Sequence, residues 1–118
     1  MVGVAWALGR AAAHRRSVGQ PEVAGSALYT FEWDAEKART NLRKHRVSFD
    51  EAATAFADPL SLTIPDPDHA LGEERFVLVG LSNRGRIVVV AHVERDGRIR
   101  LISARLASKR ERHRYEEG

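Results

Sequence analysis

The sequence predicts an α+β domain, with an antiparallel sheet of about four to five strands, two N-terminal helices packed on it and a C-terminal helix. Three features support this prediction. Two β-rich runs, residues 86–95 and 98–105, are joined by Asp96-Gly97, a dipeptide that favours a type I′ hairpin turn. Two Ser-x-x-Glu capping boxes, beginning at Ser48 and Ser108, mark the starts of helices. Alternation of large and polar residues in YTFEWD is typical of a short strand.

The predicted elements follow the order strand, two helices, four strands and helix. Asp34 caps a first helix over residues 35–46, whose apolar stripe includes Ala38 and Leu42. The second helix begins after Ser48 and ends before Asp58-Pro59, because a proline disfavours helix in the residue before it. The remaining predicted segments are the strands 60–64, 75–81, 86–95 and 98–105 and the helix 109–117.

The chain of 118 residues divides into two parts. Residues 1–28 are rich in Ala, Gly and Arg, and we expect a disordered N-terminal extension rather than a targeting peptide, since the charged part follows the apolar part. The apolar start is too short to span a membrane. Residues 29–118 form the predicted domain, for which we expect a cytoplasmic location.

The charge distribution indicates a polyanionic partner. Residues 29–74 hold five basic and ten acidic side chains, whereas residues 75–118 hold eleven basic and five acidic ones. Sixteen of the nineteen basic residues in the chain are arginine, which binds phosphate bidentately where lysine offers a point charge. RNA or DNA is therefore the first candidate ligand.

The absence of cysteine excludes disulfides, thiolate metal sites and thiol nucleophiles. The acidic loop PDPDHALGEE contains oxygen and nitrogen ligands, but their spacing matches no metal motif. We therefore expect neither a metal nor another cofactor.

The hairpin turn allows a register to be predicted. A two-residue turn pairs Arg95 with Arg98, then His92 with Leu101 and Val88 with Arg105. His92, Ser103 and Arg105 would then share one face. Arg75 lies on this face if the loop SNRG has an even number of residues and on the other face if the number is odd. Arg95, Arg98 and Arg100 project from the other face.

RNA cleavage without a metal needs a proton carrier and cations that stabilise the phosphorane. His92 is the expected proton carrier, because histidine titrates near neutral pH. Arg105, Arg95 and Arg75 are candidate phosphate ligands, and Tyr115 could stack on a base or donate a proton. His92 as a core histidine and Tyr115 as a packing anchor are the alternative interpretations.

Several blocks of residues 29–117 resemble the BrnT family of bacterial toxins in order and spacing. These blocks are Phe31-Glu32-Trp33-Asp34, Asn41 with Lys44-His45, Val47-Ser48-Phe49, Asp58-Pro59, Glu74-Arg75, and Ile102-Ser103-Ala104-Arg105 followed by Glu111 and Tyr115. The chain departs from the family where Arg46 replaces a usual glycine and Val93 a frequent threonine.

The resemblance implies a RelE-like fold and a metal-independent ribonuclease toxin of a type II toxin–antitoxin system that inhibits translation. It also implies a BrnA-like ribbon-helix-helix antitoxin, through which alone operator DNA would be bound. By analogy with RelE-like toxins we rank Arg105 and Arg95 first as catalytic residues, then Tyr115 and His92. Arg75, Lys44 and His45 are expected to bind RNA.

Two other functions remain open at this point. The first is a nucleic-acid-binding or co-repressor module that works with the antitoxin and does not cleave RNA. The second is a protein-interaction domain whose arginines contact an acidic partner.

Overall fold

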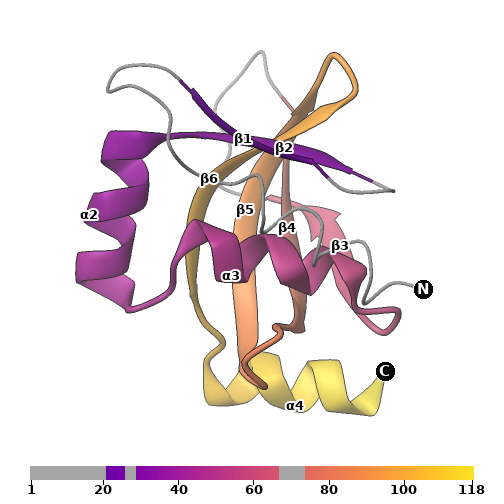
Figure 1. Ribbon diagram of the computed structural model, residues 1–118. Helices are drawn as coiled ribbons and strands as arrows, with labels where there is room; N and C mark the ends of the chain where they lie inside the picture. Colours follow the sequence, from indigo (N-terminus) through magenta and orange to yellow (C-terminus); the bar gives the residue numbers. More distant parts are fainter. Residues whose placement is uncertain (1–20, 26–28, 67–73) are drawn as a thin grey trace.

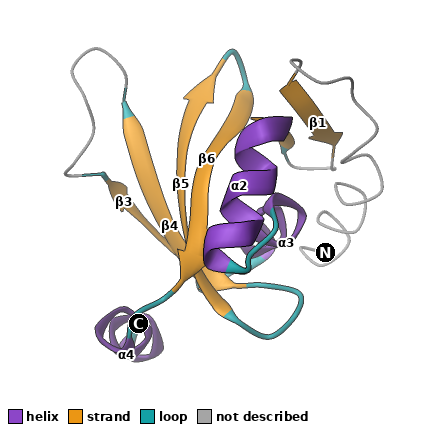
Figure 2. Ribbon diagram, turned by 90° about the vertical axis from the view of Figure 1, so that its left-hand side faces the viewer, coloured by secondary structure: helices purple, strands orange, loops and turns teal. Residues whose placement is uncertain are grey.

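The computed structural model describes residues 21–25, 29–66 and 74–118 and contains one mixed β-sheet with helices on both of its sides (Figures 1 and 2). The strands are β1 (Pro21–Gly25), β2 (Thr30–Asp34), β3 (Leu62–Pro65), β4 (Arg75–Leu81), β5 (Ile87–Arg95) and β6 (Arg98–Leu106). The helices are α2 (Ala35–His45), α3 (Phe49–Thr54), the short 3-10 helix η1 (Ala55–Ala57) and α4 (Lys109–Glu117). The α+β class predicted from the sequence is confirmed.

The strand order is β1-β2-β6-β5-β4-β3. Strands β3 to β6 form the expected antiparallel meander, but β2 pairs with β6 in parallel, with Phe31 opposite Ile99. The prediction of a wholly antiparallel sheet is therefore wrong. Hairpin signals report only on strands that are neighbours in sequence, whereas this pairing joins segments more than sixty residues apart.

Strand β1 lies at the edge of the sheet and pairs antiparallel with β2. It falls inside residues 1–28, for which we expected a disordered extension. The backbone of residues 21–25 is instead a strand, and the other residues of that segment lie outside the described residues.

Side-chain caps begin the helices as the sequence predicts. The Asp34 carboxylate accepts from the Lys37 N–H at 2.9 Å, and Ser108 and Glu111 form a complete capping box at α4. At α3 only half of the predicted box forms. The Ser48 hydroxyl accepts from the Glu51 N–H, but the Glu51 carboxylate binds elsewhere.

Helix α2 ends at Arg46, which adopts the left-handed conformation with φ 61°. This is the conformation that glycine adopts most easily at a helix end. Its N–H donates to the Leu42 carbonyl at 2.9 Å. The arginine therefore makes, at some conformational cost, a helix-ending turn that glycine adopts more easily.

The hydrophobic core lies between the sheet and the helices α2 and α3. Phe49 and Phe56 pack with Val88, Val90 and Leu101, all of which are buried. Figure 2 shows α2 and α3 on one side of the strands and α4 at the far end of the other side. Within the described part of the chain, the opposite face of the sheet therefore carries α4 at one end.

The register of the β5–β6 hairpin changes at a bulge. Arg95 pairs with Arg98 and His92 with Leu101, as predicted, and Asp96 and Gly97 both have positive φ. Beyond His92 the register shifts, so that Val89, not Val88, lies opposite Arg105. One extra residue in a strand reverses the faces of every side chain that follows.

Candidate nucleic-acid interface

Because of the bulge, Arg105 shares a face with Arg95 rather than with His92, so the predicted grouping of His92, Ser103 and Arg105 is wrong. The loop between the paired residues Leu81 and Ile87 contains an odd number of residues. Arg75 therefore lies on the same face as Arg95 and Arg105. The face opposite α3 therefore carries five arginines from three adjacent strands, and we call it the arginine face: Arg75, Arg95, Arg98, Arg100 and Arg105.

Four of these arginines lie together near the hairpin turn. Arg75 and Arg100 flank Val93 on neighbouring strands, so their Cα atoms are about 10 Å apart. Arg95 and Arg98 are directly opposite each other two residues farther along. These arginines lie close enough together to bind neighbouring phosphates of one nucleic-acid strand.

Glu32 is a counterion within this group. Its carboxylate accepts from Arg98 Nη1 at 3.1 Å and from Arg100 Nη1 at 3.4 Å. Within the part of the chain that the structure describes, no ion pair or hydrogen bond engages the Arg75 guanidinium. Glu32 is thus a carboxylate shared by Arg98 and Arg100.

Arg105 is held by the first turn of α4. Its Nη1 and Nη2 donate to the two carboxylate oxygens of Glu111 at 2.8 and 2.9 Å. The hydrogen bonds from Arg105 are the main cause that lowers the pKa of Glu111 to about 2, and they outweigh the opposing effect of burial. Arg105 remains about half exposed, so a phosphate can reach the guanidinium beside the carboxylate.

Tyr115 connects α4 to the loop after η1. Its hydroxyl donates to Asp58 Oδ2 at 2.5 Å, and the same oxygen accepts from the Leu81 N–H at 2.8 Å. Burial, with the carboxylate of Asp58, raises the pKa of Tyr115 to about 12. A phenol with so high a pKa and a fixed acceptor is a poor proton donor, so this geometry favours a positioning role.

His92 lies in the core, on the face opposite the arginines. Its side chain packs edge-on against Phe56 with ring centroids 4.8 Å apart and is close to Phe76, and only 2% of the residue is exposed. Burial lowers its pKa, against the opposing effect of a hydrogen bond to the Val90 carbonyl. The structure therefore does not bring His92 together with Arg105 or Arg95.

Lys44 and His45 lie at the end of α2, beside the bulge in β6. They line a cavity of about 260 Å³ together with Ser103, which belongs to the arginine face. His45 is half-buried, in contrast to His92. The cavity places a reachable imidazole at the margin of the arginine face.

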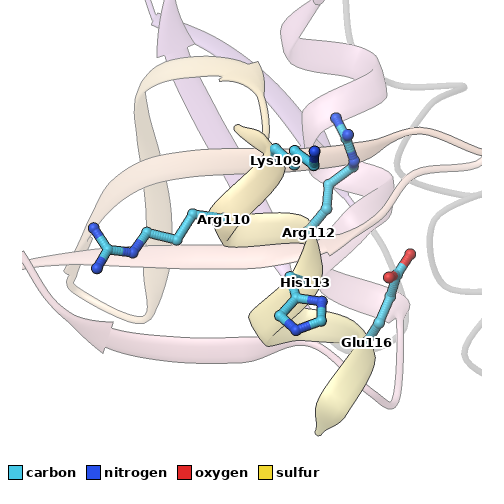
Figure 3. A pocket seen from close by; sticks show the side chains of 5 residues that line it. All are labelled: Lys109, Arg110, Arg112, His113 and Glu116. Carbon is cyan, nitrogen blue, oxygen red and sulfur yellow. The ribbon is translucent and has the colours of Figure 1, made fainter.

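The outer side of α4 is also basic. Lys109, Arg110, Arg112, His113 and Glu116 surround a shallow hollow there (Figure 3). Figure 3 shows Arg110 and Arg112 extending in opposite directions from the helix. Their guanidinium groups do not converge on one anion, which favours a solvated helix surface over a defined binding site.

Two buried polar residues bridge separate segments of the chain, and the sequence analysis named them only in a family block and in a capping box. The Asn41 amide donates to the Val47 and Ala104 carbonyls at 2.9 and 2.8 Å and accepts from the Ala104 N–H at 3.0 Å. The Glu51 carboxylate accepts from Arg86 Nε at 2.9 Å. In both cases the sequence carried one signal of this role, which is a polar residue at a helix position that faces the core.

Among the described residues, no group of three or more His, Cys, Asp or Glu side chains could hold a metal ion. Part of the acidic loop considered above, residues 67–73, lies outside the described residues. No helix in the described part of the chain is long and apolar enough to cross a membrane.

Comparisons with known proteins identify a family and a similar solved structure. Residues 33–111 match the family model described as ribonuclease toxin, BrnT, of type II toxin-antitoxin system. The chain is also similar to the crystal structure of the Brucella abortus ribonuclease toxin BrnT, with 31% sequence identity and a TM-score of 0.49. That alignment covers 65% of this chain and 94% of the Brucella chain. No curated protein matches.

Proposed function

The chain belongs to the BrnT family of ribonuclease toxins of type II toxin–antitoxin systems, and we propose that it is a metal-independent endoribonuclease that cleaves RNA on the arginine face. The observation that carries this proposal is the presence of five arginines from β4, β5 and β6 on one face of the sheet. Each guanidinium offers a planar fork that matches two phosphate oxygens.

The chemistry that such a face supports is attack by the ribose 2′-oxygen on the adjacent phosphorus. The bond from phosphorus to the 5′-oxygen breaks, which leaves a 2′,3′-cyclic phosphate and a free 5′-hydroxyl. Negative charge grows on the phosphorane oxygens in the transition state, where fixed cations are most effective. We assign this stabilisation to Arg105. Arg95 lies six residues farther along β5 than the partner of Arg105, about 20 Å away, so we assign Arg95 and Arg75 to binding phosphates elsewhere on the substrate.

Proton transfer needs a side chain that RNA can reach. The burial of His92 favours a packing role, and we assign proton transfer instead to His45, which lines the cavity beside Ser103. Lys44, exposed on the same helix turn, is assigned to phosphate binding. Tyr115 is assigned to positioning, because it fixes α4 and through it the partner of Arg105.

The proposal includes the biological setting of the family. We infer a RelE-like fold, inhibition of translation through RNA cleavage, and neutralisation by a BrnA-like ribbon-helix-helix antitoxin. Operator DNA is bound only through that antitoxin. A cytoplasmic location follows from the same inference, since the substrate is cellular RNA.

The test is expression with and without the antitoxin, followed by analysis of RNA from arrested cells. Arg105→Ala should abolish RNA fragmentation and growth arrest, whereas Arg43→Ala, an exposed arginine on α2, should have no effect. Arg105→Lys keeps the charge but loses the bidentate fork, and we expect at least about a tenfold loss of cleavage. Thermal unfolding of each variant separates loss of chemistry from loss of fold.

Intact RNA under toxic expression would contradict the proposal. Purified protein that binds RNA with a steep salt dependence but never cleaves it would instead indicate the co-repressor module.

A further inference from the structure

A small apolar pocket lies on the arginine face between α4 and the strands β3 and β4. Its volume is about 330 Å³, and its floor is formed by Leu62, Ile64, Val77 and Val79. Glu111 and Arg114 of α4 form the opposite wall. None of these floor residues belongs to the phosphate-binding set described above.

The sheet register explains why the floor is apolar. Leu62 pairs with Val79 and Ile64 with Val77, so all four side chains lie on the same face. Ile64 is 43% exposed, and the other three are only half-buried. The pocket is thus an apolar surface that the fold leaves accessible to solvent.

The same register joins this pocket to Arg105. Val79, Val89 and Arg105 form one row across three strands, so the Val79 and Arg105 Cα atoms are about 10 Å apart. Glu111 belongs to both sites, because it lines the pocket and pairs with Arg105. Arg114 adds a second guanidinium at the rim. An apolar recess next to two cations is complementary to a base and its phosphate.

We propose that this pocket binds one nucleobase of the RNA substrate while a neighbouring phosphate lies on Arg105. This inference rests on the proposed ribonuclease function. RNA that is read in single-stranded form presents unstacked bases that need an apolar surface, and this pocket provides one. An α-helix of a protein partner is about 10–12 Å wide and is too large for a recess of this volume.

The test uses an RNA hexamer with 2′-O-methyl groups, which binds but lacks the attacking hydroxyl. A series of hexamers carries one abasic position each, and binding is measured by fluorescence anisotropy. For the unmodified protein we expect one abasic position to weaken binding about tenfold, with smaller effects elsewhere. Val79→Phe fills the pocket, so the complete hexamer should bind as weakly as the abasic one.

Ile64→Ala removes part of the pocket floor at its exposed edge and provides a second variant if Val79→Phe does not fold. It should reduce the abasic effect by at least about threefold. Leu60→Phe adds the same aromatic group at a residue that is 70% exposed and outside the pocket, and it should bind like the unmodified protein.

Salt-dependent binding with no abasic effect at any position would overturn the pocket and leave the ribonuclease proposal intact. The base-binding proposal would also be overturned if the Val79→Phe variant kept its RNA affinity but was no longer neutralised by the antitoxin. That result would assign the pocket to a protein partner. No RNA binding at all would overturn both proposals.

Discussion

Arg105 and Glu111 form a bidentate ion pair that joins the end of β6 to the first turn of α4. The same Glu111 carboxylate accepts from the Ser108 N–H at 2.8 Å, so one side chain both caps the helix and orients the arginine. A phosphate that binds Arg105 must share or displace this carboxylate. The position of α4 and the state of the arginine are therefore coupled.

The first prediction concerns acid stability. The folded-state pKa of Glu111, about 2, lies below its unfolded value of about 4.3, so its ion pair stabilises the fold above about pH 5 and that contribution is lost toward pH 2. Glu111→Gln should thus be less stable than the unmodified protein at pH 6, with the difference vanishing near pH 2. Urea midpoints between pH 6 and pH 2 measure this.

Glu117→Gln is the control, since Glu117 lies in the same helix with a side chain that is 67% exposed. Its effect should be small at every pH. A destabilisation by Glu111→Gln that did not change with pH would show that the carboxylate acts without its charge.

The parts of the fold that depend on nearby residues could be predicted from the sequence. The caps at Asp34 and Ser108 and the turn at Asp96-Gly97 each follow from residues within one turn of one another. The parallel pairing of β2 with β6 and the bulge between His92 and Arg105 depend on packing between distant segments. No local pattern encodes them.

The sequence named Arg105, Arg95 and Arg75 as candidate site residues from arginine chemistry and, for Arg75 and Arg105, from family blocks. Their roles stay predictions, and the sequence did not predict which of them share a face. The apolar run around His92 fits equally well a core histidine and a catalytic one, and only the contacts with Phe56 and Phe76 distinguish them. The sequence predicted Glu111 as part of a helix cap. Its ion pair with Arg105 could not be predicted, because it depends on how α4 packs at the end of β6.

The second prediction concerns Tyr115. Tyr115→Phe keeps the ring but loses the hydrogen bond to Asp58, so the free energy of unfolding should fall by about 1 kcal/mol at pH 7. If Tyr115 positions α4, cleavage by the folded variant should stay within about threefold of the unmodified protein. Loss of cleavage as severe as that in Arg105→Ala would assign the phenol a chemical role.

The ionisation of Tyr115 provides an independent measurement. In a Tyr29→Phe background Tyr115 is the remaining tyrosine, and its absorbance change should have a midpoint near pH 12. Because the folded pKa is raised, the stabilisation is present below about pH 10 and is lost as the pH rises toward 12. A midpoint near pH 10 would contradict the hydrogen bond.

The third prediction concerns Asn41, whose amide takes the place of a neighbouring strand beside Ala104. Asn41→Ala would leave the Ala104 N–H and two buried carbonyls without partners. We expect a loss of about 3 kcal/mol in the free energy of unfolding, measured by chemical denaturation. Arg43→Ala on the exposed side of the same helix should change stability by less than about 0.5 kcal/mol; equal losses would disprove the bridging role.

The fourth prediction concerns the buried Glu51, of which 4% is exposed. Burial raises its pKa, but hydrogen bonds from Arg86 and Ser82 outweigh this and lower it overall. Arg86→Met removes the main partner and should cost about 3 kcal/mol or more, measured by urea denaturation.

Arg84 is the matched control, because it lies 3.9 Å from the same carboxylate with a side chain that is 68% exposed. Arg84→Met should cost less than about 1 kcal/mol. Similar losses in both variants would mean that net charge, rather than the buried contact, determines stability.

The fifth prediction separates the two histidines. His45 lines a cavity beside the arginine face, so His45→Ala should lower the rate of RNA cleavage at least about tenfold with little change in unfolding free energy.

His92 packs against Phe56 in the core, and burial keeps its pKa low, so the imidazole is neutral at pH 7. His92→Leu should therefore reduce stability while the folded fraction still cleaves RNA at close to the normal rate. Single-turnover cleavage with unfolding curves on the same samples measures both quantities. Normal stability with lost cleavage in His92→Leu would return the proton-transfer role to His92.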